Sequence, residues 1–151
     1  MAIQNATNVA IRVGGTGAGN TIGFATSASL SVSMDLRDST NKQSLRWQEN
    51  LGGLKSFELS GDAFVDLSGD TATNVNDPFE SGSTTETATV KLLPSLYTTW
   101  EAGTEVDVVF GNSGKNYTGK GIITSISIDA GVEENATYSI SITGTGALTQ
   151  A

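Results

Sequence analysis

The chain has 151 residues, and its 16 acidic and 8 basic side chains give a formal net charge of −8 at pH 7. It contains no cysteine and no histidine, which excludes disulfides and thiolate metal sites and removes the commonest general base and metal ligand. This length predicts a single domain, and an acidic chain without a basic run is not suited to gripping nucleic-acid phosphates.

The N-terminal residues give no sign of export or membrane insertion. Residues 1–8 lack both the basic stretch and the apolar core of a signal peptide. No apolar run approaches the roughly 18–20 residues that span a bilayer. We therefore expect a protein that is made in a cytoplasm and has no membrane contact.

A first hairpin is expected near the N-terminus. Val9, Ile11 and Val13 recur at every second position, a glycine-rich stretch covers residues 14–20, and Ile22 and Phe24 resume the strand. The spacing of three of these glycines invites comparison with a phosphate-binding loop. The residues that follow are extended in character, whereas such a loop needs a helix. A hairpin tip or an inter-subunit loop is the better interpretation.

Residues 28–34 alternate between apolar and polar side chains, which predicts a half-buried strand. A polar loop is then predicted over residues 35–55, and alternation resumes over 56–65. Loops of more than about 12–15 residues are usually functional or disordered. This one contains Trp47, Leu51 and Leu54, so we expect it to pack against something.

The middle of the chain predicts a second long polar loop over residues 67–88 and then the only helix. The apolar residues that follow are spaced as on one helix face. Pro94 suits a first turn and Gly103 a stop, which places the helix near residues 94–102. The apolar stripe consists of Leu92, Leu93, Leu96, Tyr97 and Trp100.

Three further strands are expected after the helix, over residues 106–110, 122–128 and 138–143, with a turn at 111–114. In the second of these, Ile122, Thr124, Ile126 and Ile128 are predicted to share one face, opposite Ser125 and Ser127. The whole chain is therefore predicted to be mostly β with one short helix, as antiparallel sheets in a β-sandwich or barrel.

No catalytic or metal site is predicted. Residues 66–77 place oxygen side chains at some calcium-ligand positions, but Thr71 stands where glycine is needed and Asp77 where a bidentate glutamate is needed. Glu58 and Asp62 on one strand face lie about 13 Å apart, which is too far for a pair of hydrolytic carboxylates. A monomeric calcium- or glycan-binding β-sandwich module remains the alternative function.

The polar strand faces are unusual because they carry small hydroxyl side chains and almost no charge. One interpretation is the solvated side of an antiparallel sheet. The other is a wet, smooth surface past which something slides.

Two blocks of sequence resemble the major tail protein, or tail tube protein, family of long-tailed bacteriophages. The first contains residues 38–44, Trp47-Gln-Glu49 and residues 53–57, and the second contains residues 123–128, 132–138 and 142–146. The chain departs from the family at Leu45 and Arg46, where small glycine-rich residues would be expected, and at Gly52, where proline is common.

The resemblance implies one tail tube domain over residues 1–151, with no cofactor and no enzymatic activity, that forms hexameric rings stacked into a hollow tube. Other tail proteins (tip or initiator, terminator and tape measure) are the implied partners, with DNA as passing cargo. The implied location is the virion tail, assembled in the host bacterial cytoplasm. We predict as lumen-lining residues Ser29, Ser31, Ser33, Glu58, Ser60, Asp62, Ser125, Ser127, Ser139 and Ser141. We predict as contacts between subunits or rings Arg37, Lys42, Arg46, Trp47, Leu51 and Leu54.

Overall fold

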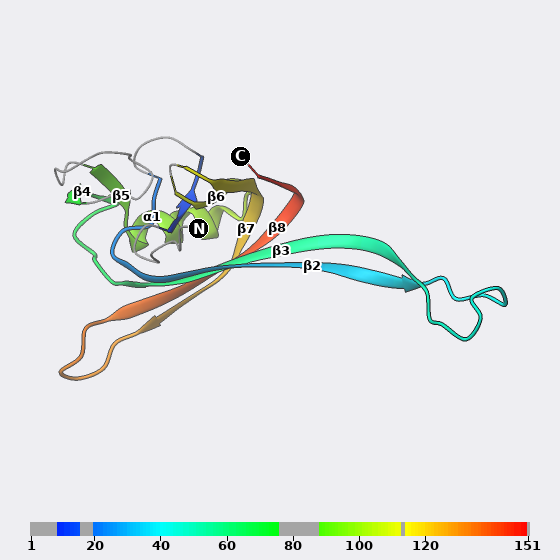
Figure 1. Ribbon diagram of the computed structural model, residues 1–151. Coiled ribbons are helices and arrows are strands. Elements are labelled where there is room, and N and C mark those ends of the chain that lie inside the picture. Colours follow the sequence, from blue (N-terminus) through cyan, green and yellow to red (C-terminus); the bar gives the residue numbers. More distant parts are fainter. Residues whose placement is uncertain (1–8, 16–19, 76–87, 113, 151) are drawn as a thin grey trace.

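The computed structural model describes residues 9–15, 20–75, 88–112 and 114–150. Six strands form one antiparallel sheet in the order β1-β6-β7-β8-β3-β2, and two form a small separate sheet, β4-β5. Over these residues the fold is therefore mostly β with one helix, as predicted (Figure 1). The elements are β1 (Ala10–Val13), β2 (Ala25–Asp38), β3 (Asn50–Phe64), β4 (Thr71–Val75), β5 (Ala88–Lys91), α1 (Leu93–Ala102), β6 (Val106–Gly111), β7 (Asn116–Asp129) and β8 (Thr137–Gln150).

The large sheet is strongly curved, so that β1, at one edge, lies close to β3 near the other edge. Ile11 of β1 approaches Gly61 of β3, although three strands (β6, β7 and β8) separate β1 from β3 in the sheet order. Inward-facing residues of β3, β6, β7 and β8 fill the space between, together with two leucines of α1. The core includes Ile11, Val13, Phe57, Leu59, Val108, Ile123, Tyr138, Ile140, Ile142, Leu93 and Leu96.

Helix α1 confirms the predicted helix within one residue. Pro94 lies in its first turn, and Gly103 ends it in the left-handed conformation (φ 64°) with its N–H donated to the carbonyl of Trp100. Leu93 and Leu96 are buried, whereas Tyr97 and Trp100 are exposed and lie with ring centroids 5.5 Å apart. Three of the five residues of the predicted apolar stripe, Leu92, Leu93 and Leu96, are therefore buried.

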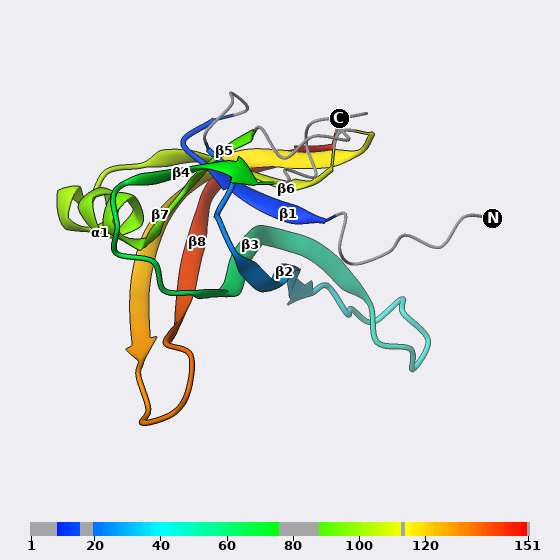
Figure 2. The ribbon, with the colours of Figure 1, turned by 90° about the vertical axis from the view of Figure 1, so that its left-hand side faces the viewer.

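The loop predicted over residues 35–55 is shorter than expected. Strand β2 continues to Asp38 and β3 begins at Asn50, so the loop spans residues 39–49. A bulge between Met34 and Leu36 lets the two strands stay paired as far as Asp38 and Asn50. The backbone pairing continues across the bulge. Strand β2 therefore extends past Met34, at which the predicted strand ended. The resulting hairpin projects well beyond the body (Figures 1 and 2).

The prediction that Ile122 shares a face of β7 with Ile126 and Ile128 was wrong. The register with β8 shifts between Ile123 and Ser125, which places an extra residue, Thr124, in β7. One extra residue moves every earlier side chain to the other face. Ile123 is therefore buried opposite Ile142, and Ile122 lies on the face predicted for serines.

The first hairpin forms only in part. Arg12 bridges Thr21 in antiparallel fashion, but Ile22 then bridges Lys91 of β5, and Phe24 has a positive φ and is exposed. The expected tip at 16–19 lies outside the described residues, as does most of the second predicted loop, residues 76–87. Strand β4 occupies residues 71–75 of that loop.

Candidate functional site: a hydroxyl-rich sheet face and a projecting arm

Four neighbouring strands, β7, β8, β3 and β2, present a single polar face. One row across them joins Ser127, Ser139, Asp62 and Ser27, and the next joins Ser125, Ser141, Ser60 and Ser29. Directly paired residues of antiparallel strands project to the same side. By this pairing and by strand alternation, the structure brings the predicted lumen residues together on one face: Ser29, Ser31, Ser33, Glu58, Ser60, Asp62, Ser125, Ser127, Ser139 and Ser141.

The side chains of this polar face bond to one another. The hydroxyls of Ser29 and Ser60 lie 2.6 Å apart, and those of Ser33 and Ser56 lie 2.8 Å apart. Asp62 accepts hydrogen bonds from Ser27 (3.0 Å) and Ser139 (2.5 Å), so its carboxylate links three strands. Much of the hydrogen-bonding capacity is therefore satisfied sideways, within the sheet.

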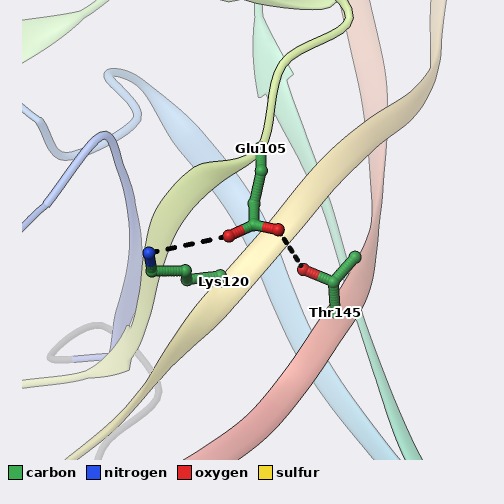
Figure 3. A network of polar contacts seen from close by, with 3 residues as sticks. All are labelled: Glu105, Lys120 and Thr145. Carbon is green, nitrogen blue, oxygen red and sulfur yellow. Dashed lines mark hydrogen bonds and ion pairs between the residues drawn. The ribbon is translucent and has the colours of Figure 1, made fainter.

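The charge on the polar face is sparse and negative. Glu58 and Asp62 are the only charged residues among the ten candidates. At its margin, the ammonium of Lys120 lies 3.6 Å from the carboxylate of Glu105, which also accepts a hydrogen bond from the Thr145 hydroxyl at 3.0 Å (Figure 3). Exposed pairs like this contribute about 0–1 kcal/mol. Its effect here is to leave that cation partly neutralised.

The distal β2–β3 hairpin, residues 32–56, is here called the arm. Val32, Met34 and Leu36 project from the same side of β2 as Ala28 and Leu30, which pack on the core. On the arm this apolar face is uncovered, and Val32 and Leu36 are each 64% exposed. The sequence predicted a half-buried strand because alternation does not reveal where the covering layer ends.

The loop at the end of the arm is held by its own hydrogen bonds. Ser44 is buried, its hydroxyl accepts the N–H of Asn41, and its carbonyl accepts the N–H of Trp47. The Asp38 carboxylate accepts the N–H of Thr40 at 2.8 Å, and hydrogen bonds from Thr40 lower the pKa of Asp38. The Trp47 side chain is nevertheless 79% exposed. The loop is thus ordered internally while it displays its largest apolar group.

All six predicted contact residues lie on the arm. Leu45 and Arg46 have φ values of 49° and 74°, the region that favours glycine. The backbone conformation accounts for the small residues expected there from the resemblance. The contact candidates are Arg37, Lys42, Arg46, Trp47, Leu51 and Leu54.

The four strands of the polar face have two open edges. Strand β2 ends the sheet, and β6 pairs with β7 only over residues 116–121, so among the described residues no strand pairs with residues 122–129 on that side of β7. Unpaired edges present free N–H and C=O groups that can pair with another chain. The sequence analysis did not predict this second edge, because it placed the strands at 106–110 and 122–128 and did not show that β7 begins at Asn116 and extends beyond β6.

A cavity beside these surfaces, in the described part of the chain, is too small for a ligand. This cavity of about 10 Å³ lies between β1 and β3 and is lined in part by Ile11, Asp62 and Tyr138, which leaves room for about one water. Among the described residues, no group of three acidic side chains could hold a metal ion. Asp66, the first residue of the stretch 66–77 that was weighed as a calcium loop, accepts the N–H of Ser68, and Asp77 lies outside the described residues.

The chain is similar to one protein family over nearly its whole length. A family model described as phage tail tube protein matches residues 4–150. No curated protein matches. Within the described part of the chain, no helix is long and apolar enough to cross a membrane.

Several solved structures share the fold. The tail of an empty gene transfer agent particle, refined with C6 symmetry, has a TM-score of 0.72 at 20% identity and covers 99% of both chains. The SPP1 tail tube has a TM-score of 0.61 at 12% identity, covering 94% of this chain and 75% of its own. A chain of the baseplate of the anti-feeding prophage has a TM-score of 0.58 at 10% identity, and the match covers 100% of this chain and 95% of that one.

Proposed function

Because the chain belongs to the phage tail tube protein family, a family of structural proteins, we propose that its copies join edge to edge into rings that stack into a hollow tube for DNA. One observation carries this proposal: the ten predicted lumen residues share one face, and that face ends in two open strand edges.

The open edges supply the joint within a ring. Strand β2 of one copy pairs with residues 122–129 of β7 in the next, so each copy contributes four strands to a continuous barrel. A barrel has no free edges, which removes the aggregation hazard of the isolated chain. The C6 symmetry of the gene transfer agent tail supports six copies to a ring.

The polar face lines the bore. Two carboxylates, Glu58 and Asp62, come from each of six copies, twelve in all, and no lysine or arginine is among the ten candidates. DNA binding depends on cations that neutralise phosphates, so this lining repels DNA without holding it. Screening limits the repulsion to about 8 Å from the wall at physiological salt. Four of the eight candidate serine hydroxyls, those of Ser29, Ser33, Ser60 and Ser139, are hydrogen-bonded within the sheet, which reduces the number of donors for passing phosphates.

The arm supplies contacts with neighbouring copies. Its uncovered apolar face continues the core-facing side of the sheet, so the body of an adjacent copy is the surface that covers it. Trp47 acts as an anchor surrounded by polar residues. Tail tip, terminator and tape-measure proteins are the further partners, and the tube belongs to the virion tail assembled in the host cytoplasm.

Electron microscopy of the purified protein tests this function. Negatively stained samples should contain rings with a central hole at moderate concentration and stacked tubes at high concentration. The protein should be titrated over salt and concentration, with and without a tail-tip fraction to start assembly. Small monomeric particles under all these conditions would contradict the proposal. A melting temperature raised by calcium or oligosaccharide would then support the monomeric binding module.

A further inference from the structure

The two long hairpins end at opposite ends of the polar face. Asn50 begins β3 at the arm end, whereas Phe64 ends β3 opposite Thr137, at the start of β8. The fourteen steps between Asn50 and Phe64 correspond to about 45 Å along the strand. The arm and the β7–β8 hairpin accordingly leave the body in different directions (Figures 1 and 2).

The arm is the more cationic of these two ends. It carries Arg37, Lys42, Arg46 and Lys55, which are four of the eight basic residues of the chain. Among the described residues, none of these four cations has an ion-pair partner. The Trp47 side chain lies between Lys42 and Lys55 in sequence and is exposed. The arm also contains Asp35, Asp38 and Glu49, so its net charge is 4 − 3 = +1. Its cations without ion-pair partners include Arg46, the neighbour of the exposed Trp47 in the chain.

The turn at the opposite end has the complementary chemistry. Residues 129–136, here called the β7–β8 turn, contain Asp129, Glu133 and Glu134 and no basic residue. Val132 at its tip is 93% exposed, and Ile128 beside it is also exposed. The turn thus presents a small apolar surface within an acidic rim.

We propose that the arm of each copy docks on the β7–β8 turn of a copy in the adjacent ring, with Lys42 and Arg46 facing Glu133 and Glu134 and Trp47 covering Val132. This inference rests on the proposed tube. Rotation about the tube axis keeps all arms of one ring at the same end, so the turn that an arm meets belongs to the next ring. Two rings that met through their β7–β8 turns would bring acidic residues against acidic residues. Charge repulsion therefore favours the head-to-tail arrangement, in which the arms of one ring meet the turns of the next.

Charge exchange between two variants tests the docking. The arm variant is Lys42→Glu with Arg46→Glu, and the turn variant is Glu133→Lys with Glu134→Lys. Each alone places like charges in contact, and the concentration needed for tubes should rise about tenfold or more, the equivalent of about 1.4 kcal/mol. Mixed together, the variants should form tubes again, because rings of one kind alternate with rings of the other. A single chain with all four changes should also form tubes.

Controls separate this docking from general charge effects. Lys115→Glu, in the β6–β7 turn, and Asp70→Lys with Glu101→Lys, on other exposed surfaces, should leave tube formation within twofold of the wild type. Rings should persist in each docking variant. Loss of tubes that mixing fails to restore would overturn the docking, and so would wild-type tube growth in both single variants. Absence of rings and tubes in the wild type would instead overturn the proposed function.

Discussion

Phe57 of β3 lies against Gly144 of β8, where a Cβ atom would collide with the phenyl ring. Gly144→Ala should therefore lower the free energy of unfolding by about 1–3 kcal/mol, because a well-packed core has no room for the added methyl. Urea denaturation of the unassembled protein measures this.

Gly69→Ala is the matched control, since its Cβ atom would meet only the Thr71 carbonyl at 3.9 Å; a change within about 0.5 kcal/mol is expected. Adding Phe57→Leu to Gly144→Ala should recover part of the loss. Equal stability of the two alanine variants would show that Phe57 can move aside.

Trp47→Ala should leave the monomer folded and prevent tube growth. The Trp47 side chain is 79% exposed, so its loss should change the unfolding free energy by no more than about 0.5 kcal/mol. Circular dichroism checks the fold and electron microscopy checks the assembly. The control is Trp100→Ala, because Trp100 is also exposed but lies on α1, away from the arm. Tubes of normal length from Trp47→Ala would contradict the role given to the arm.

Ser31→Lys combined with Ser127→Lys should slow DNA passage without hindering assembly. In the proposed tube, two ammonium groups from each copy would then face the bore and bind phosphates, whereas the ten polar-face candidates include no cation. The rate of DNA release from purified particles is the measurement, with a DNA-binding dye as reporter. Ser31→Gln with Ser127→Gln adds similar bulk without charge, and release should stay near the wild-type rate. Unchanged release from the lysine variant would mean that this face does not line the bore.

Tyr138→Phe should reduce the loss of folding stability that the protein undergoes at alkaline pH. The Tyr138 hydroxyl has no hydrogen-bond partner among the described residues, and burial raises its pKa from 10.0 to about 12. The unfolded chain loses this proton above about pH 10 while the folded protein keeps it. The contribution of Tyr138 to the free energy of unfolding is therefore fully present below about pH 10. It falls by about 1.4 kcal/mol per pH unit towards pH 12.

The measurement is urea denaturation at pH 9 and pH 11.5, in which Tyr138→Phe should lose less stability between the two values than the wild type. Tyr97→Phe, which removes an exposed hydroxyl, should behave like the wild type. An identical pH dependence in Tyr138→Phe would show that Tyr138 ionises without cost in the fold.

The alternation of apolar and polar residues was enough to predict the mostly β fold class. The helix could be predicted because Pro94, Gly103 and the spacing of the leucines act locally in the chain. The grouping of the ten polar-face residues also followed from alternation once the strands were paired. The face of Ile122 could not be predicted, since the bulge at Thr124 depends on how β7 meets β8.

The arm shows a second limit of local patterns. Val32 and Leu30 obey the same alternation, yet Leu30 packs on the core and Val32 is exposed. The difference arises because the strands outrun the body that covers them, which depends on the tertiary arrangement. The open edge of β7 has the same origin, since β6 is shorter than its neighbour.

The length of β3 also sets a scale for the whole tail. Its fifteen residues correspond to about 50 Å of strand. Strands in closed barrels tilt by about 35–45°, so the same strand covers roughly 35–40 Å along the bore axis. A ring cannot rise by more than this and still have its lining meet that of the next ring. In the proposed tube, the length of β3 therefore sets an upper limit to the rise of each ring, and two residues added to each of the four strands would raise that limit.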